Sequence, residues 1–85
     1  MSIQETFEAA VAASKTLTTR PDNNTLLKLY SLYKQATEGD APDAGPSNPF
    51  DFIAKAKYDA WSALEGMGED DAMNQYAALV DSLKK

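Results

Sequence analysis

Two short stretches of the chain combine aromatic rings with lysines at helical spacing. Tyr30, Tyr33 and Lys34 stand at positions i, i+3 and i+4, so they share one face of a helix. Lys57 and Trp61 are four residues apart and share a face in the same way. Lysines provide point charges for phosphate, and aromatic rings offer a surface on which a base stacks. The two stretches therefore predict a site for a phosphorylated ligand that carries an aromatic ring.

The same pattern has an ordinary structural interpretation. Tyrosines at helical spacing commonly lie at the edge of a core with the hydroxyl at its rim. A lysine on an exposed helix face is commonly just solvated. Spacing alone leaves both interpretations open.

Several residue types on which catalytic and metal sites depend are missing. The 85-residue chain has no His and no Cys, which excludes Ser-His-Asp and Cys-His catalysis and zinc bound by thiolate or imidazole. Acidic residues gather at Glu65 and at 69–71, where the latter oppose the positive end of a helix dipole. They do not follow the ligand pattern of a calcium-binding loop. We expect no catalytic residue, no metal site and no cofactor.

The net charge limits the classes of partner that the protein can bind. Thirteen acidic and eight basic residues give a net charge of -5, which argues against nucleic-acid binding because that binding needs a basic footprint. No apolar run approaches the roughly 20 residues of a membrane span. Residues 1–5 lack the basic and apolar parts of a leader. We expect a cytoplasmic protein with at most transient contact with membranes or enzymes.

Apolar periodicity predicts four helices and no strand. The first spans about residues 3–16 after a Ser2–Glu5 capping box. The second spans about 23–37, with Asp22 or Asn23 as its cap and Gly39 at its end. The predicted third helix runs from an Asp51 cap to Gly66, and the fourth begins at Glu69.

A long loop separates the second and third predicted helices. Residues 39–50 hold three of the four prolines and two of the four glycines, which favours irregular structure. We expect Phe50 and Phe52 to anchor the far end of this loop in the core. The predicted fold is an all-α, up-down four-helix bundle that forms one domain over residues 1–85. A monomer is expected because no heptad seam is sustained.

Three motifs resemble those of the acyl-CoA-binding protein family. Residues 30–40 read YSLYKQATEGD, close to the family pattern Tyr-Ser-x-Tyr-Lys-Gln-Ala-Thr-x-Gly-Asp. Residues 55–61 read KAKYDAW, similar to Lys-x-Lys-(Trp/Tyr)-x-Ala-Trp. Residues 71–76 read DAMNQY, similar to Asp-Ala-Met-x-x-Tyr. The motifs follow one another in the family's order along the chain, so the chain resembles a free-standing member.

The resemblance implies a binding site for one long-chain fatty acyl-CoA. In the family the adenine stacks on the tyrosine that matches Tyr33. The 3′-phosphate is held by the residues that match Tyr30, Lys34 and Lys57. Residues on the first and fourth helices complete the implied ligand-binding set, which is Lys15, Tyr30, Tyr33, Lys34, Lys57 and Tyr76.

The implied function is non-catalytic binding and transport of long-chain acyl-CoA thioesters in the cytoplasm, buffering their pool and shielding the thioester. Two alternatives stay open. One is a helical protein-interaction module without a small ligand. The other is an enzyme acting on acyl-CoA, which the absence of His and Cys disfavours. Tyr58 and Ile53 stand where relatives often have Trp and Lys, so the preferred acyl length is left open.

Overall fold

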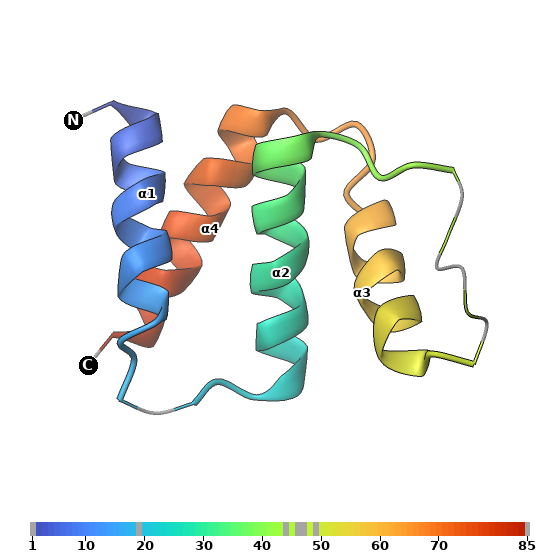
Figure 1. Ribbon diagram of the computed structural model, residues 1–85. Coiled ribbons are helices and arrows are strands. Elements are labelled where there is room, and N and C mark those ends of the chain that lie inside the picture. Colours follow the sequence, from blue (N-terminus) through green and yellow to red (C-terminus); the bar gives the residue numbers. More distant parts are fainter. Residues whose placement is uncertain (1, 19, 44, 46–47, 49, 85) are drawn as a thin grey trace.

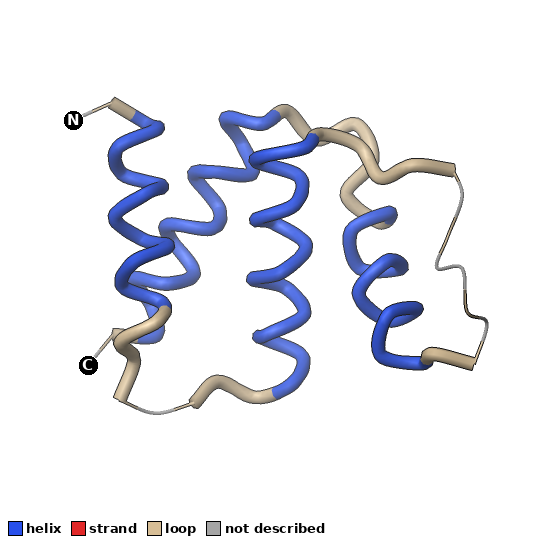
Figure 2. The backbone as a smooth tube through the Cα atoms, in the orientation of Figure 1, coloured by secondary structure: helices blue, strands red, loops and turns tan. Residues whose placement is uncertain are grey.

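The computed structural model describes residues 2–18, 20–43, 45, 48 and 50–84. Within them the chain forms four helices and no strand (Figures 1 and 2). This confirms the predicted all-α, four-helix fold. The helices are α1 (Ile3–Ser14), α2 (Asn23–Glu38), α3 (Phe52–Ser62) and α4 (Glu69–Leu83).

The predicted starts of α1 and α2 are confirmed by their hydrogen bonds. The backbone N–H of Glu5 donates to Ser2 Oγ at 3.1 Å, and the backbone N–H of Ser2 donates to Glu5 Oε1 at 3.1 Å, which completes the capping box. Asp22 caps α2 by accepting from the Thr25 N–H at 2.7 Å. Gly39 ends α2 with φ of 78°, a conformation that glycine adopts without steric cost.

Two helices are shorter than predicted. α1 ends at Ser14 instead of residue 16, and the Thr16 hydroxyl donates to the Ala13 carbonyl at 3.0 Å. This local bond competes with continuation of the helix. α3 ends at Ser62 instead of continuing to Gly66, because residues 63–66 form successive turns that close with Gly66 at φ of 90°.

The directions of the helices depart from a strict up-down alternation. In Figure 1, α2 and α3 run the same way, while α1 and α4 run the opposite way. The first turns of α2 and α3 therefore lie at the same end of the molecule. In the described residues α1 packs on α4, α4 on α2 and α2 on α3. Helix α2 is therefore flanked on both sides.

The main core lies where α1, α2 and α4 meet. Leu32 is 2% exposed and Val80 is fully buried. α3 adds Trp61, whose indole N–H donates to the Gly39 carbonyl at 2.8 Å. The buried core cluster comprises Phe7, Ala10, Leu29, Leu32, Ala36, Ala72, Met73, Tyr76 and Val80.

The prediction that Phe50 and Phe52 anchor the loop in the core is wrong. Their side chains are 80% and 74% exposed. In the described residues α3 packs on α2 alone, and its buried residue, Trp61, lies in its last turn. Phe50 precedes α3 and Phe52 begins it, so both rings lie at the opposite end of the helix from Trp61 and face solvent.

Polar contacts join the C-terminal end of α2 to the turn that follows α3. Gln35 is fully buried, and its Nε2 donates to Asp40 Oδ1 at 2.9 Å and to the Met67 carbonyl at 2.8 Å. The Gly66 N–H donates to the same Asp40 oxygen at 2.9 Å. Both bonds favour the charged carboxylate and so lower the pKa of Asp40, and the bond from Gln35 has the larger effect.

Candidate functional site

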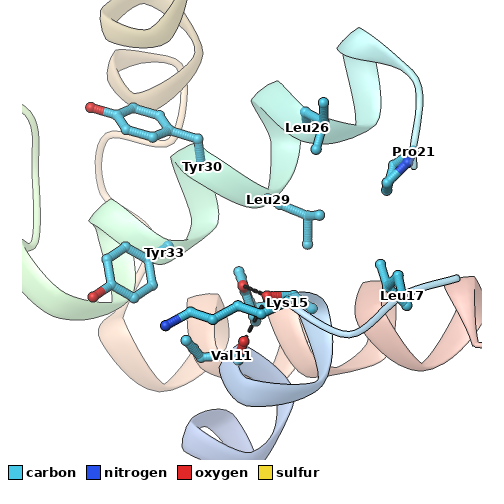
Figure 3. A pocket seen from close by; sticks show the side chains of 10 residues that line it. Val11, Lys15, Leu17, Pro21, Leu26, Leu29, Tyr30 and Tyr33 are labelled. Atoms are coloured by element: carbon cyan, nitrogen blue, oxygen red, sulfur yellow. Dashed lines mark hydrogen bonds between the residues drawn. The ribbon is translucent and has the colours of Figure 1, made fainter. Parts of the chain in front are cut away.

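The first candidate cavity lies between α1 and α2, with α4 beneath it, and has a volume of about 340 Å³. In Figure 3 the Lys15 side chain extends from the end of α1 toward Tyr33. The hydroxyls of Tyr30 and Tyr33 point to the same side of the cavity. The lining residues are Val11, Ser14, Lys15, Leu17, Pro21, Leu26, Leu29, Tyr30, Tyr33 and Tyr76. The cavity thus joins apolar walls to an aromatic and basic rim.

Three aromatic rings hold the shape of this cavity. The rings of Phe7 and Tyr33 stack with centroids 6.0 Å apart, and Tyr76 meets Phe7 edge-on at 5.2 Å. The Tyr76 hydroxyl donates to Ser14 Oγ at 3.2 Å, which fixes the ring from the α1 side. Phe7 and Tyr76 are buried, whereas Tyr33 is 40% exposed. Tyr33 therefore offers a supported ring to which a planar group has access.

A second cavity of about 440 Å³ lies between α2 and α3. Its apolar side chains come from the first half of each helix, and Arg20, Asn23 and Lys57 also line it. Tyr30 and Leu26 line both cavities, so the two share a wall on α2. The lining residues are Arg20, Asn23, Leu26, Leu27, Tyr30, Phe52, Ile53, Ala56 and Lys57.

Five of the six residues of the predicted set gather around these cavities. Lys15, Tyr33 and Tyr76 line the first cavity, Lys57 lines the second, and Tyr30 lines both. Lys57 Nζ lies 5.3 Å from the centroid of the Tyr30 ring, a cation–π distance that connects α3 to the shared wall.

Lys34, the sixth residue, does not line either cavity. Its Nζ donates to the Glu38 carboxylate and lies 5.2 Å from the centroid of the Trp61 ring. The hydrogen bond to Glu38 is the main cause that raises the pKa of Lys34, because it favours the ammonium form. The structure thus gives this lysine two partners on the α2–α3 side, in place of a position at the rim of the first cavity.

Several lining residues were missed by reasoning from the sequence. Arg20, Phe52 and Ile53 border the second cavity, and the sequence signal for them was weak. The apolar pattern of α2 did carry a signal, because Leu26, Leu27 and Leu29 make its stripe wider than one buried face. That width is explained by two cavities on opposite sides of the helix.

The described residues contain no group of three or more Asp, Glu, His or Cys side chains placed to hold a metal ion. No described helix combines the length and apolar character needed to cross a membrane.

Comparison with known proteins identifies the family. The family model for acyl CoA binding protein matches residues 4–80. The acyl-CoA-binding protein homolog 1 of Caenorhabditis elegans is 48% identical over 77 residues, which cover 91% of this chain and 88% of that protein. The crystal structure of Oryza sativa acyl-CoA-binding protein 2 superposes with a TM-score of 0.87 at 39% identity, covering 96% of this chain and 90% of that one. The chain belongs to the acyl-CoA-binding protein family, which confirms the resemblance read from its motifs.

The family domain also occurs inside a larger protein. Enoyl-CoA delta isomerase 2 of Rattus norvegicus is 46% identical over 80 residues, which cover 94% of this chain and 20% of the isomerase. The match leaves four fifths of the isomerase without a counterpart in this chain.

Proposed function

We propose that the chain binds one long-chain fatty acyl-CoA thioester as a carrier and buffer, without transforming it, in the cytoplasm. The observation that supports this most strongly is the pair of cavities on the two sides of α2, which share Tyr30 and Leu26. One has an aromatic and basic rim suited to a nucleotide. The other has apolar walls suited to an alkyl tail.

In the proposed complex the adenine stacks on Tyr33 in the first cavity, within reach of Tyr76 and Lys15. The rings of Phe7 and Tyr76 support Tyr33 from behind, so stacking a base there requires little ordering of the protein. The 3′-phosphate lies by Tyr30 and Lys57. Lys34 joins it after its ammonium turns away from Glu38.

The acyl tail lies in the second cavity, against Leu27 and Ala56. Each methylene buried there contributes about 0.8 kcal/mol, less the cost of ordering the tail. The tail therefore supplies much of the affinity, while the nucleotide supplies orientation and specificity. Binding of this kind requires no nucleophile or general base.

Calorimetric titration with a long-chain acyl-CoA, free CoA and the free fatty acid tests the proposal. The acyl-CoA should bind far more tightly than either half, because each half gives up the contacts that the other half makes. Three equally weak ligands would overturn the proposal and favour the alternative of a helical interaction module that has no small-molecule ligand.

A further inference from the structure

Large apolar side chains are exposed together at the start of α3. Phe50, Phe52 and Ile53 are 80%, 74% and 72% exposed. Among the described residues, the other exposed large hydrophobic side chain is Tyr33, at 40%. A single exposed apolar side chain is ordinary, but a contiguous group of them marks a surface that binds something apolar. We call Phe50, Phe52 and Ile53 the α3 patch.

The α3 patch is continuous with the second cavity. Phe52 and Ile53 belong to both, while Phe50 stands outside the cavity lining. Figure 1 shows that the first turn of α3 and the first turn of α2 lie at the same end of the molecule. An alkyl tail in the second cavity therefore lies next to an exposed apolar surface.

Two acidic residues of this region, Asp51 and Asp59, are exposed, and each contacts a partner on α3 itself. Asp51, between the two phenylalanines, accepts the Ala54 N–H through Oδ1 at 3.0 Å. Asp59 pairs with Lys55 at 3.1 Å. Each carboxylate thus has a partner within three or four residues of it along the chain.

Cationic side chains line the same cavity as two members of the α3 patch. Arg20 and Lys57 both line the second cavity beside Phe52 and Ile53. Aromatic and aliphatic side chains beside cations form the combination that lies well at a bilayer interface, with rings among the acyl chains and cations among the phosphates.

We propose that the α3 patch docks on a phospholipid bilayer, so that the acyl tail passes directly between the bilayer and the second cavity. This inference rests on the proposed function, because it needs a ligand with a long alkyl tail. A tail that crossed water would expose every methylene on the way. Contact between the patch and the bilayer removes that exposure. A recipient protein is the competing occupant, but a cation beside the patch, Arg20, which the proposed ligand does not use, matches lipid phosphates.

Phe50 allows the surface to be tested apart from ligand binding, because it lines neither cavity. Flotation of the ligand-free chain with phosphatidylcholine vesicles measures docking. Phe50→Ser should lower the vesicle-bound fraction about tenfold, as expected when a partly inserted ring is lost. Phe50→Leu is the matched control and should dock nearly as well as the wild type. Both variants should bind acyl-CoA as the wild type does in the absence of vesicles.

Transfer kinetics test the consequence of docking. An acyl-CoA with a fluorescent tail is transferred from the protein to vesicles in a stopped-flow instrument. The transfer rate should rise with vesicle concentration for the wild type and for Phe50→Leu, and much less for Phe50→Ser. A wild-type rate independent of vesicle concentration, or equal flotation of the wild type and Phe50→Ser, would overturn the inference. A chain that binds a recipient protein but does not float would overturn it too.

The two proposals fail in distinguishable ways. If acyl-CoA does not bind in the absence of vesicles, the proposed function fails. Flotation uses the ligand-free chain, so it still tests whether the α3 patch docks on the bilayer.

Discussion

The Nζ atom of Lys57, on α3, lies 5.3 Å from the centroid of the Tyr30 ring, on α2. Tyr30 lines both cavities, so this ammonium stands at the junction between the aromatic rim and the apolar groove. A cation over an exposed ring contributes about 0.5–1 kcal/mol. The same cation is available to an anionic group of the ligand. Lys57 thus connects the packing of α3 on α2 to the proposed recognition of phosphate.

Replacing Lys57 by alanine should weaken acyl-CoA binding by about ten- to a hundredfold, because a charge-assisted hydrogen bond to phosphate contributes roughly 1.5–3 kcal/mol. Calorimetry measures the change. Lys57→Arg is the conservative control and should keep most of the affinity. The loss should shrink when the ligand lacks its 3′-phosphate. An equal loss with both ligands would place Lys57 away from that phosphate.

Glu38 competes with the ligand for Lys34. Glu38→Gln should strengthen acyl-CoA binding several-fold, because the ammonium no longer has to leave a carboxylate partner. Glu8→Gln removes the same charge from an exposed position on α1 and controls for the change in net charge. If the two variants bind alike in calorimetry, Lys34 takes no part in holding the ligand.

The sequence predicted more of the fold than of the site. The capping box, the Asp22 cap and Gly39 are local signals, and each appears where it was expected. Local sequence signals do not determine how the chain runs between α2 and α3. They therefore did not predict that these two helices run in the same direction. The exposure of Phe50 and Phe52 was missed for a related reason, since burial depends on which helix covers the first turn of α3.

The site was predictable where one helix face carries it. Tyr30 and Tyr33 share a face of α2, so spacing selected them together. Lys34 follows Tyr33 directly, but successive residues of a helix face different directions around its axis. Lys34 therefore contacts Glu38 and Trp61 instead. Ser14 and Arg20 reach the cavities only through tertiary packing, which spacing does not encode.

Tyr58 should hold the loop that follows α2. Its hydroxyl donates to the carbonyls of Pro42 and Asp43, the latter at 3.3 Å, and Gly45 lies against its ring. Tyr58→Phe keeps the ring and removes the donor, at a cost of about 1 kcal/mol. Amide hydrogen exchange of Ala41 and Asp43 should then become faster, while exchange in α1 stays unchanged. Unaltered exchange at these two amides would show that the hydroxyl does not restrain the loop.

Asp40 should make the fold sensitive to acid. The pKa of its carboxyl lies below the ordinary value of 3.8 because Gln35 and Gly66 donate to it. A lowered pKa stabilises the folded state at pH values above 3.8, and that stabilisation is lost as the pH falls through the folded-state pKa. Thermal melts of Asp40→Asn should therefore show less loss of Tm between neutral and acid pH than the wild type. An identical pH dependence would exclude Asp40 as a source of the sensitivity.

Filling the second cavity is the most direct test of the proposal that the acyl tail binds there. Ala56→Trp places a large ring between α2 and α3, whereas the first cavity contains no residue of α3. Calorimetry with a series of acyl-CoA chain lengths should show affinity that rises with each methylene in the wild type. In Ala56→Trp this rise should disappear, while free CoA binds with its wild-type affinity. A variant that retains the full dependence on chain length would contradict the account, as would a wild type whose affinity does not depend on chain length.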